Sequence, residues 1–129
     1  MALPYKLLVV DDEKTSRVLV ISVAMALGFD NIREAEDGVQ ALAAVEEEQP
    51  DFLVLDLQMP NKDGMEVLQD LSRQHRLEDM GVMMLTATNE ERYIQDAIML
   101  GADDYLAKPI DINELQDRLK EMVDENQPS

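Results

Sequence analysis

The chain has 129 residues, 46% of them hydrophobic, and it carries 11 basic against 28 acidic residues, for a net charge of −17. This charge argues against direct binding to nucleic acid or to anionic membrane surfaces. The absence of cysteine excludes disulfides and thiol chemistry. The N-terminus lacks a signal-peptide pattern, and the longest apolar run, 18–29, is too short to span a bilayer. We therefore expect a cytoplasmic protein.

The apolar pattern alternates between strands and helices along the chain. Strands are predicted at 5–10, 31–36, 51–56, 81–87 and 103–109. Helices are predicted at 14–28, 38–49, 64–74, 90–101 and 112–124. This alternation is typical of right-handed βαβ units, and the strands lack polar alternation, as expected when helices cover both faces of a parallel sheet. The length suits one domain over residues 1–129, with a core at about 5–124 and a polar tail at 125–129.

Two acidic pairs mark the starts of predicted helices. Asp63 is followed three residues later by Glu66, and Asp111 by Glu114. An N-cap acid with Glu at the third helical position forms a capping box, in which each side chain accepts a backbone N–H group. We therefore expect Asp63 to have a structural role at the start of its helix.

Charged and hydroxyl side chains stand where the strong strands end: Asp11 and Asp12 after the first, Asp56 at the third, Thr86 at the fourth and Lys108 at the fifth. Because the carboxyl ends of parallel strands lie along one edge, these residues should converge there. Crowded carboxylates raise one another's pKa unless a cation lies among them. A hard divalent ion such as Mg²⁺, which uses few carboxylates and keeps several waters, fits this cluster.

The lysine adds a second requirement to this site. Lys108 cannot ligate a metal ion, so a cation beside it suggests an anion between the two, and a phosphoryl group is the obvious candidate. Thr86 supplies a hydroxyl for one phosphoryl oxygen, and Asp56 is the candidate nucleophile that would form an acyl phosphate. Asp11, Asp12 or Asp56 alone could equally cap a helix or end a strand, and threonine alone is common in strands. Only their combination indicates a site.

Four segments carry a resemblance to a known family: VVDDE, LVLDLQMPNKDG, LTAT and GADDYLAKPI. In this order and spacing, they make residues 5–124 similar to the receiver domain of bacterial two-component response regulators. The resemblance implies a flavodoxin-like, doubly wound (βα)5 fold with a five-stranded parallel sheet in the order 2-1-3-4-5. It also implies a phosphoprotein of phosphorelay signalling rather than an enzyme, with self-phosphotransfer and slow autodephosphorylation as its only reactions.

The same resemblance implies the phosphoacceptor and the metal ligands. Asp56 looks like the phosphoacceptor. Asp12 and Asp56 look like direct Mg²⁺ ligands, with the backbone carbonyl of Gln58 as a third. Asp11 looks like a ligand that acts through water. Gly64 fits the tight turn that follows this loop.

Further roles follow at the ends of the fourth and fifth strands. Lys108 looks like the phosphoryl-binding ammonium, followed by a cis bond to Pro109. Thr86 looks like the switch hydroxyl, and the backbone amide of Ala87 is expected to touch the phosphoryl group. Tyr105 looks like the switch aromatic, which turns inward when Thr86 moves.

Two further positions bear on how long the phosphoryl group lasts. In the family, the side chains at the positions of Gln58 and Thr88 border the path of the water that hydrolyses the acyl phosphate. Thr88 has no carboxylate to orient this water. We therefore predict slow self-dephosphorylation.

The partners also follow from the resemblance. A sensor histidine kinase or a histidine phosphotransfer protein would present phosphohistidine to Asp56. The surface of the fourth helix, fifth strand and fifth helix would then signal to an output partner that the sequence does not identify. A phosphorylation-dependent dimer is left open, as is the alternative that the chain is a receiver domain excised from a longer multidomain regulator.

Two other protein classes fit the sequence less well. A Mg²⁺-dependent phosphatase of the haloacid dehalogenase type also uses a strand-end aspartate, but it places a second aspartate two positions later, where this chain has Gln58. A flavodoxin-like flavin binder needs a hydroxyl- and glycine-rich phosphate loop after the first strand. This chain has Asp11, Asp12 and Glu13 there, which would repel phosphate.

Overall fold

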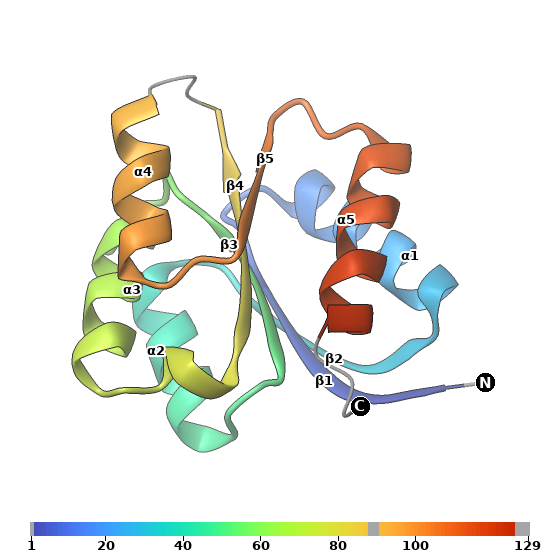
Figure 1. Ribbon diagram of the computed structural model, residues 1–129, viewed down its shortest axis with the longest axis horizontal. Coiled ribbons are helices and arrows are strands. Elements are labelled where there is room, and N and C mark those ends of the chain that lie inside the picture. Colours follow the sequence, from blue (N-terminus) through green and yellow to red (C-terminus); the bar gives the residue numbers. More distant parts are fainter. Residues whose placement is uncertain (1, 88–90, 126–129) are drawn as a thin grey trace.

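The computed structural model describes residues 2–87 and 91–125 and contains one parallel sheet (Figure 1). Its strands are β1 (Leu3–Val10), β2 (Phe29–Ala35), β3 (Phe52–Asp56), β4 (Gly81–Thr86) and β5 (Asp104–Ala107). They lie in the order β2-β1-β3-β4-β5, and every neighbouring pair is parallel. The flavodoxin-like order 2-1-3-4-5 is therefore confirmed.

Five helices connect or follow the strands. They are α1 (Lys14–Leu27), α2 (Gly38–Glu47), α3 (Gly64–Arg73), α4 (Glu91–Leu100) and α5 (Ile112–Glu125). Figure 1 shows α1 and α5 on one face of the sheet and α2, α3 and α4 on the other. A short 3-10 helix, η1 (Leu77–Asp79), was not predicted. Among the described residues, no helix has the length and apolar character needed to cross a membrane.

The first two strands begin earlier than their local patterns indicate. Gly28 ends α1 with a φ of 111°, a left-handed conformation that glycine adopts without strain. The chain therefore turns directly into β2 at Phe29 instead of at the predicted residue 31. The amide of Leu3 donates to the carbonyl of Gly28 at 2.8 Å, which extends β1 back from residue 5.

The sheet has an apolar core on each face. Along β3, Leu53 and Leu55 pack into the cluster shared with α2, α3 and α4, whereas Phe52 and Val54 pack into the cluster shared with α1 and α5. Successive strand residues point to opposite faces, so two cores require apolar residues at every position. Each such side chain, when fully buried, stabilises the fold by about 1.5–3 kcal/mol. Packing on both faces therefore holds the strands, and with them the residues at the carboxyl edge of the sheet, in place.

The loop from β3 to α3 is held tightly against that edge. The Asp63 side chain accepts the amide of Glu66 at 2.9 Å, and Glu66 accepts the amide of Asp63 at 3.3 Å, which confirms the predicted capping box. Gly64 lies so close to β3 that a Cβ atom there would stand 2.4 Å from the carbonyl oxygen of Asp56. The loop therefore closes over the end of β3 only with glycine at this position.

Candidate acidic site at the carboxyl edge of the sheet

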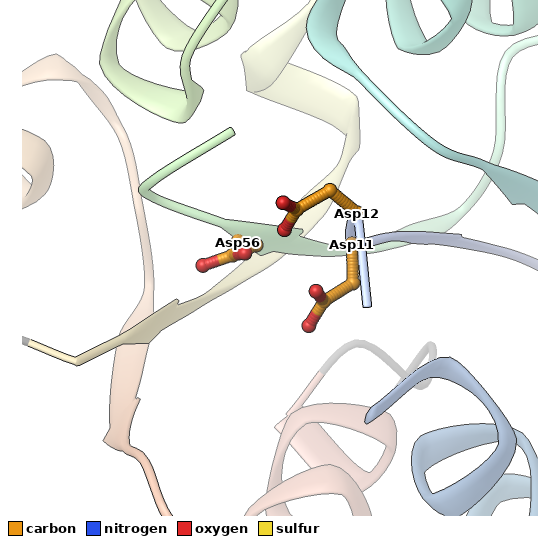
Figure 2. A group of neighbouring side chains, drawn as sticks. All are labelled: Asp11, Asp12 and Asp56. Atoms are coloured by element: carbon orange, nitrogen blue, oxygen red, sulfur yellow. The ribbon is translucent and has the colours of Figure 1, made fainter. Parts of the chain in front are cut away.

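Three aspartates meet where β1 and β3 end (Figure 2). Asp11 follows β1, and its amide continues the ladder to Ala35 at 3.2 Å, while Asp56 is the last residue of β3. One carboxylate oxygen each from Asp11, Asp12 and Asp56 lies within 4.8 Å of the other two. Asp11 and Asp56 are buried, and Asp12 is exposed. The predicted convergence of these three residues is therefore present.

The environment of Asp11 suits a cation. Its Oδ1 accepts the amide of Glu13 at 2.9 Å, but its Oδ2 is fully buried without a hydrogen-bond partner. The nearest cation to Oδ2 is the Lys108 ammonium, at 3.0 Å. A buried carboxylate oxygen without a hydrogen bond is costly unless positive charge lies beside it. The donor set is all oxygen, as Mg²⁺ prefers, so the residues fit this ion.

Asp56 has an altered acidity. Its Oδ1 accepts the amide of Gln58 at 3.3 Å, and its Oδ2 lies 3.3 Å from Lys108 Nζ. Burial, followed by the negative charge of Asp11, raises the pKa of Asp56 to about 7, although Lys108 acts in the opposite direction. Near neutral pH the group is therefore balanced between its acid and its carboxylate. A divalent cation in the cluster would favour the carboxylate.

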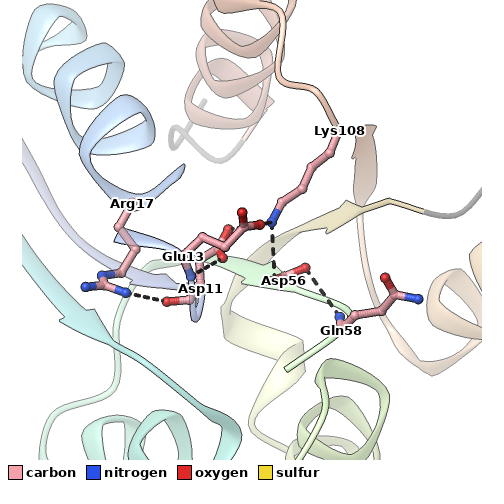
Figure 3. Close-up of polar contacts among 6 residues, drawn as sticks. All are labelled: Asp11, Glu13, Arg17, Asp56, Gln58 and Lys108. Carbon is pink, nitrogen blue, oxygen red and sulfur yellow. Dashed lines mark hydrogen bonds and ion pairs between the residues drawn. The ribbon is translucent and has the colours of Figure 1, made fainter. Parts of the chain in front are cut away.

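Lys108 lies at the centre of the site's ion pairs (Figure 3). Its amide donates to the carbonyl of Thr86 at 2.8 Å just beyond β5, and its bond to Pro109 is cis. The ammonium Nζ lies 2.9 Å from Glu13, 3.0 Å from Asp11 and 3.3 Å from Asp56. Burial alone would lower the pKa of Lys108, but these carboxylates raise it overall. The side chain is therefore a permanent cation that points into the acidic cluster.

Two residues that contact the site were not predicted from the sequence. Glu13 was noted only as part of an acidic run, yet its carboxylate makes the shortest contact to Lys108. Arg17 was not singled out, yet its buried guanidinium donates to the carbonyl of Asp11 at 2.7 Å and to Glu34 at 3.0 Å. One signal existed for Arg17, because it occupies the same buried helix face as Val20.

The other predicted residues take separate positions. Thr86 is buried at the end of β4, and Tyr105 on β5 is 39% exposed. Both line a narrow cavity beside α4. Gln58 and Ala87 are exposed, whereas Thr88 lies outside the described residues. The structure thus places Thr86 and Tyr105 next to one cavity, and their role as a switch stays a prediction.

The fold and the site together define a class of protein. It is a flavodoxin-like protein whose parallel sheet carries buried carboxylates and a lysine at its carboxyl edge. A family model described as the response regulator receiver domain matches residues 7–120. The chain belongs to this family.

Relatives of two lengths match the chain. A Synechocystis protein, the DNA-binding dual master transcriptional regulator RpaA, is 40% identical over 124 residues, which are 94% of this chain and 49% of that protein. Chemotaxis protein CheY-3 of Vibrio cholerae is 33% identical over 119 residues, 92% of each protein. The chain therefore spans about half of the first relative and nearly all of the second.

Among solved structures, a CheX–CheY–BeF3–Mg complex from Borrelia burgdorferi superposes with a TM-score of 0.85 at 26% identity. The match covers 92% of this chain and 89% of that chain.

Proposed function

We propose that this receiver domain accepts a phosphoryl group on Asp56 from a phosphohistidine donor, in the presence of Mg²⁺, and then signals through the surface formed by α4, β5 and α5. The observation that carries the proposal is the meeting of a strand-end carboxyl, two further aspartates and a lysine at one edge of the sheet. The donor would be a sensor histidine kinase or a histidine phosphotransfer protein.

The residues for the metal follow from the cluster. Asp12 and Asp56 would hold Mg²⁺ directly together with the Gln58 carbonyl, and Asp11 would act through water. The buried Oδ2 of Asp11, which lacks a hydrogen bond, supports this arrangement. So does the Borrelia relative, whose structure contains BeF3 and Mg. When bound, Mg²⁺ would supply positive charge to the crowded carboxylates and the transferring phosphoryl oxygens.

The chemistry assigned to the chain is nucleophilic attack by Asp56. Its ionised carboxylate attacks phosphorus, the bond from phosphorus to the donor imidazole nitrogen breaks, and the electron pair of that bond stays on the imidazole. The product is an acyl phosphate on Asp56. Lys108 stabilises the negative charge on the transferring oxygens, because its ammonium already lies 3.3 Å from Asp56. The amide of Ala87 and the hydroxyl of Thr86 are the further proposed donors to these oxygens.

The proposed switch connects this reaction to the surface. Thr86 would move toward the phosphoryl group, and Tyr105 would turn from its exposed position into the cavity that both residues line. Such a shift would favour an active arrangement of α4, β5 and α5. Gln58, whose side chain is exposed beside Asp56, and Thr88 would set the rate of hydrolysis.

The output is proposed as a protein partner or a second phosphorylated copy of the chain. The net charge of −17 disfavours nucleic acid as a direct ligand of this domain, although a relative of about twice its length is described as DNA-binding. A pull-down with the beryllofluoride-activated protein would identify what the active surface binds.

The central test is the site of phosphorylation. We expect the protein to gain the mass of one phosphoryl group from acetyl phosphate with Mg²⁺, and to gain none when EDTA is present. Asp56→Asn should abolish the gain. Asp51→Asn is the matched control, because Asp51 stands before β3 rather than at its end, and it should retain the gain. Borohydride reduction of the acyl phosphate that marks any residue other than Asp56 would refute the proposal.

A further inference from the structure

The Lys108 ammonium is paired with carboxylates before any phosphoryl group arrives. Its Nζ donates to Glu13 at 2.9 Å and to Asp56 at 3.3 Å, and Asp11 Oδ2 lies 3.0 Å away as an ion-pair partner. The side chain is only 13% exposed, so water supplies little alternative solvation. A phosphoryl oxygen that approaches Lys108 therefore competes with these carboxylates for the ammonium.

The three carboxylates differ in how firmly they are held. The Asp11 side chain is fully buried, and its Oδ1 accepts the amide of Glu13. Asp56 belongs to β3 and is itself the group that would carry the phosphoryl. Only Glu13 has a largely exposed side chain, at 58%. Glu13 is thus the carboxylate that can withdraw into solvent.

The backbone of Glu13 allows this movement without any change in the fold. Glu13 is the N-cap residue of α1, but its side chain makes no capping hydrogen bond. Its carbonyl accepts the amide of Arg17 at 3.1 Å, and its amide is bound to Asp11 at 2.9 Å. Rotation about the side-chain bonds alone would release Lys108 and leave these backbone contacts in place.

We infer that Glu13 is a resting-state counterion of Lys108 that competes with the phosphoryl group for the ammonium and so restrains phosphorylation. Both ligands are anions and both need the same N–H groups, so occupancy by one opposes the other. Glu13 acts through Lys108 and is a regulatory positioning residue. This inference rests on the proposed function of Asp56.

Glu13→Gln tests the competition directly. The substitution keeps the shape of the side chain but removes its charge, and the initial rate of phosphorylation by acetyl phosphate at fixed Mg²⁺ should rise about three- to fivefold. Glu47→Gln is the matched control, because Glu47 is an exposed acid at the opposite end of α2 from the site. Its rate should change by less than about twofold. A Glu13→Gln rate equal to or below that of the wild type overturns the inference.

A second readout separates binding from turnover. Beryllofluoride titrations with Mg²⁺, followed by backbone amide NMR, should show tighter binding in Glu13→Gln by a factor similar to the gain in rate. The affinity for Mg²⁺ alone should stay within about twofold, since Glu13 is outside the aspartate cluster. If tighter Mg²⁺ binding accounted for the whole increase in beryllofluoride affinity, Glu13 would not be competing for Lys108.

The dependence on Lys108 is tested in a Lys108→Met background. Adding Glu13→Gln to this variant should give no increase in rate or in beryllofluoride affinity, because the contested ammonium is gone. A similar increase in both backgrounds would mean that only the general negative field changed, and the inference would fail. If the wild type gains no phosphoryl group, the proposed function fails instead. A phosphorylated wild type with no faster Glu13→Gln variant refutes the competition alone.

Discussion

Aspartates lie at both edges of the sheet, but their carboxylates differ in how many hydrogen bonds they accept. At the amino edge, the Asp51 carboxylate accepts the amide of Lys6 at 2.8 Å, and the Asp103 carboxylate accepts the amide of Val82 at 2.7 Å. At the carboxyl edge, Oδ2 of Asp11 has no hydrogen bond, and Asp56 has only one amide contact, at 3.3 Å. The same residue type is satisfied at one edge and left short of donors at the other.

The position of the donors explains this difference. The amino-edge carboxylates accept amides from neighbouring strands, whereas Asp11 and Asp56 accept amides two residues further along their own loops, which leaves their second oxygens without an amide donor. At the carboxyl edge the chain places like charges together and adds one lysine among them. A cation among such carboxylates relieves their mutual repulsion. We therefore expect the amino-edge aspartates to stabilise the fold and the carboxyl-edge aspartates to serve the proposed metal ion.

The largest expected effect concerns the metal. Asp11→Asn should weaken Mg²⁺ binding by about 10- to 100-fold, because in the proposed site Asp11 supports the ion through water and the substitution removes the charge of its buried Oδ2. Asp51→Asn removes the same charge at the other edge and should leave Mg²⁺ affinity within about twofold of the wild type. Isothermal titration of the two variants measures both values. Equal losses would mean that the edges do not differ in ligand binding.

Substituting an aspartate by asparagine should change the free energy of unfolding in opposite directions at the two edges. Without metal, Asp56→Asn should raise the free energy of unfolding by on the order of 1–3 kcal/mol, because it removes a buried charge that faces Asp11. Asp51→Asn should lower it by about 0.5–1 kcal/mol, because a charge-assisted hydrogen bond becomes a neutral one. Urea unfolding in EDTA measures both. If Asp56→Asn instead lowered the free energy of unfolding, the two edges would not differ in the way described.

The carboxyl-edge cluster could be predicted from the sequence, but its internal contacts could not. Asp11, Asp56 and Lys108 follow apolar runs, and parallel topology alone brings such ends to one edge. The contact from Glu13 to Lys108 joins residues 95 positions apart through flexible side chains in loops, for which no periodic pattern exists. Arg17 shares the buried face of its helix with Val20, but one of its partners is a backbone carbonyl, which no sequence pattern identifies. The start of β1 was missed because it depends on a tertiary hydrogen bond to Gly28.

The smallest expected effect is on how the free energy of unfolding depends on pH. The folded-state pKa of Asp56, about 7, lies above the ordinary aspartate value of 3.8 that is expected when the chain is unfolded. Between these values the folded state binds the extra proton, so stability from this group is present at low pH and falls as pH rises. With a discount for screening by solvent, the free energy of unfolding of the metal-free protein should fall by about 1 kcal/mol between pH 5.5 and 7 from Asp56 alone.

The Asp56→Asn variant isolates this contribution from the repulsion of the other acidic residues. Urea unfolding in EDTA at several pH values should give the wild type the steeper decline, and the difference between the two curves should grow toward pH 7. Asp51→Asn should run parallel to the wild type, because this substitution at the amino edge leaves Asp56 and its neighbours unchanged. Added Mg²⁺ should reverse the wild-type decline, since the proposed metal site uses the ionised form of Asp56. Parallel curves for wild type and Asp56→Asn would show that the carboxyl-edge charge is already relieved in the metal-free protein.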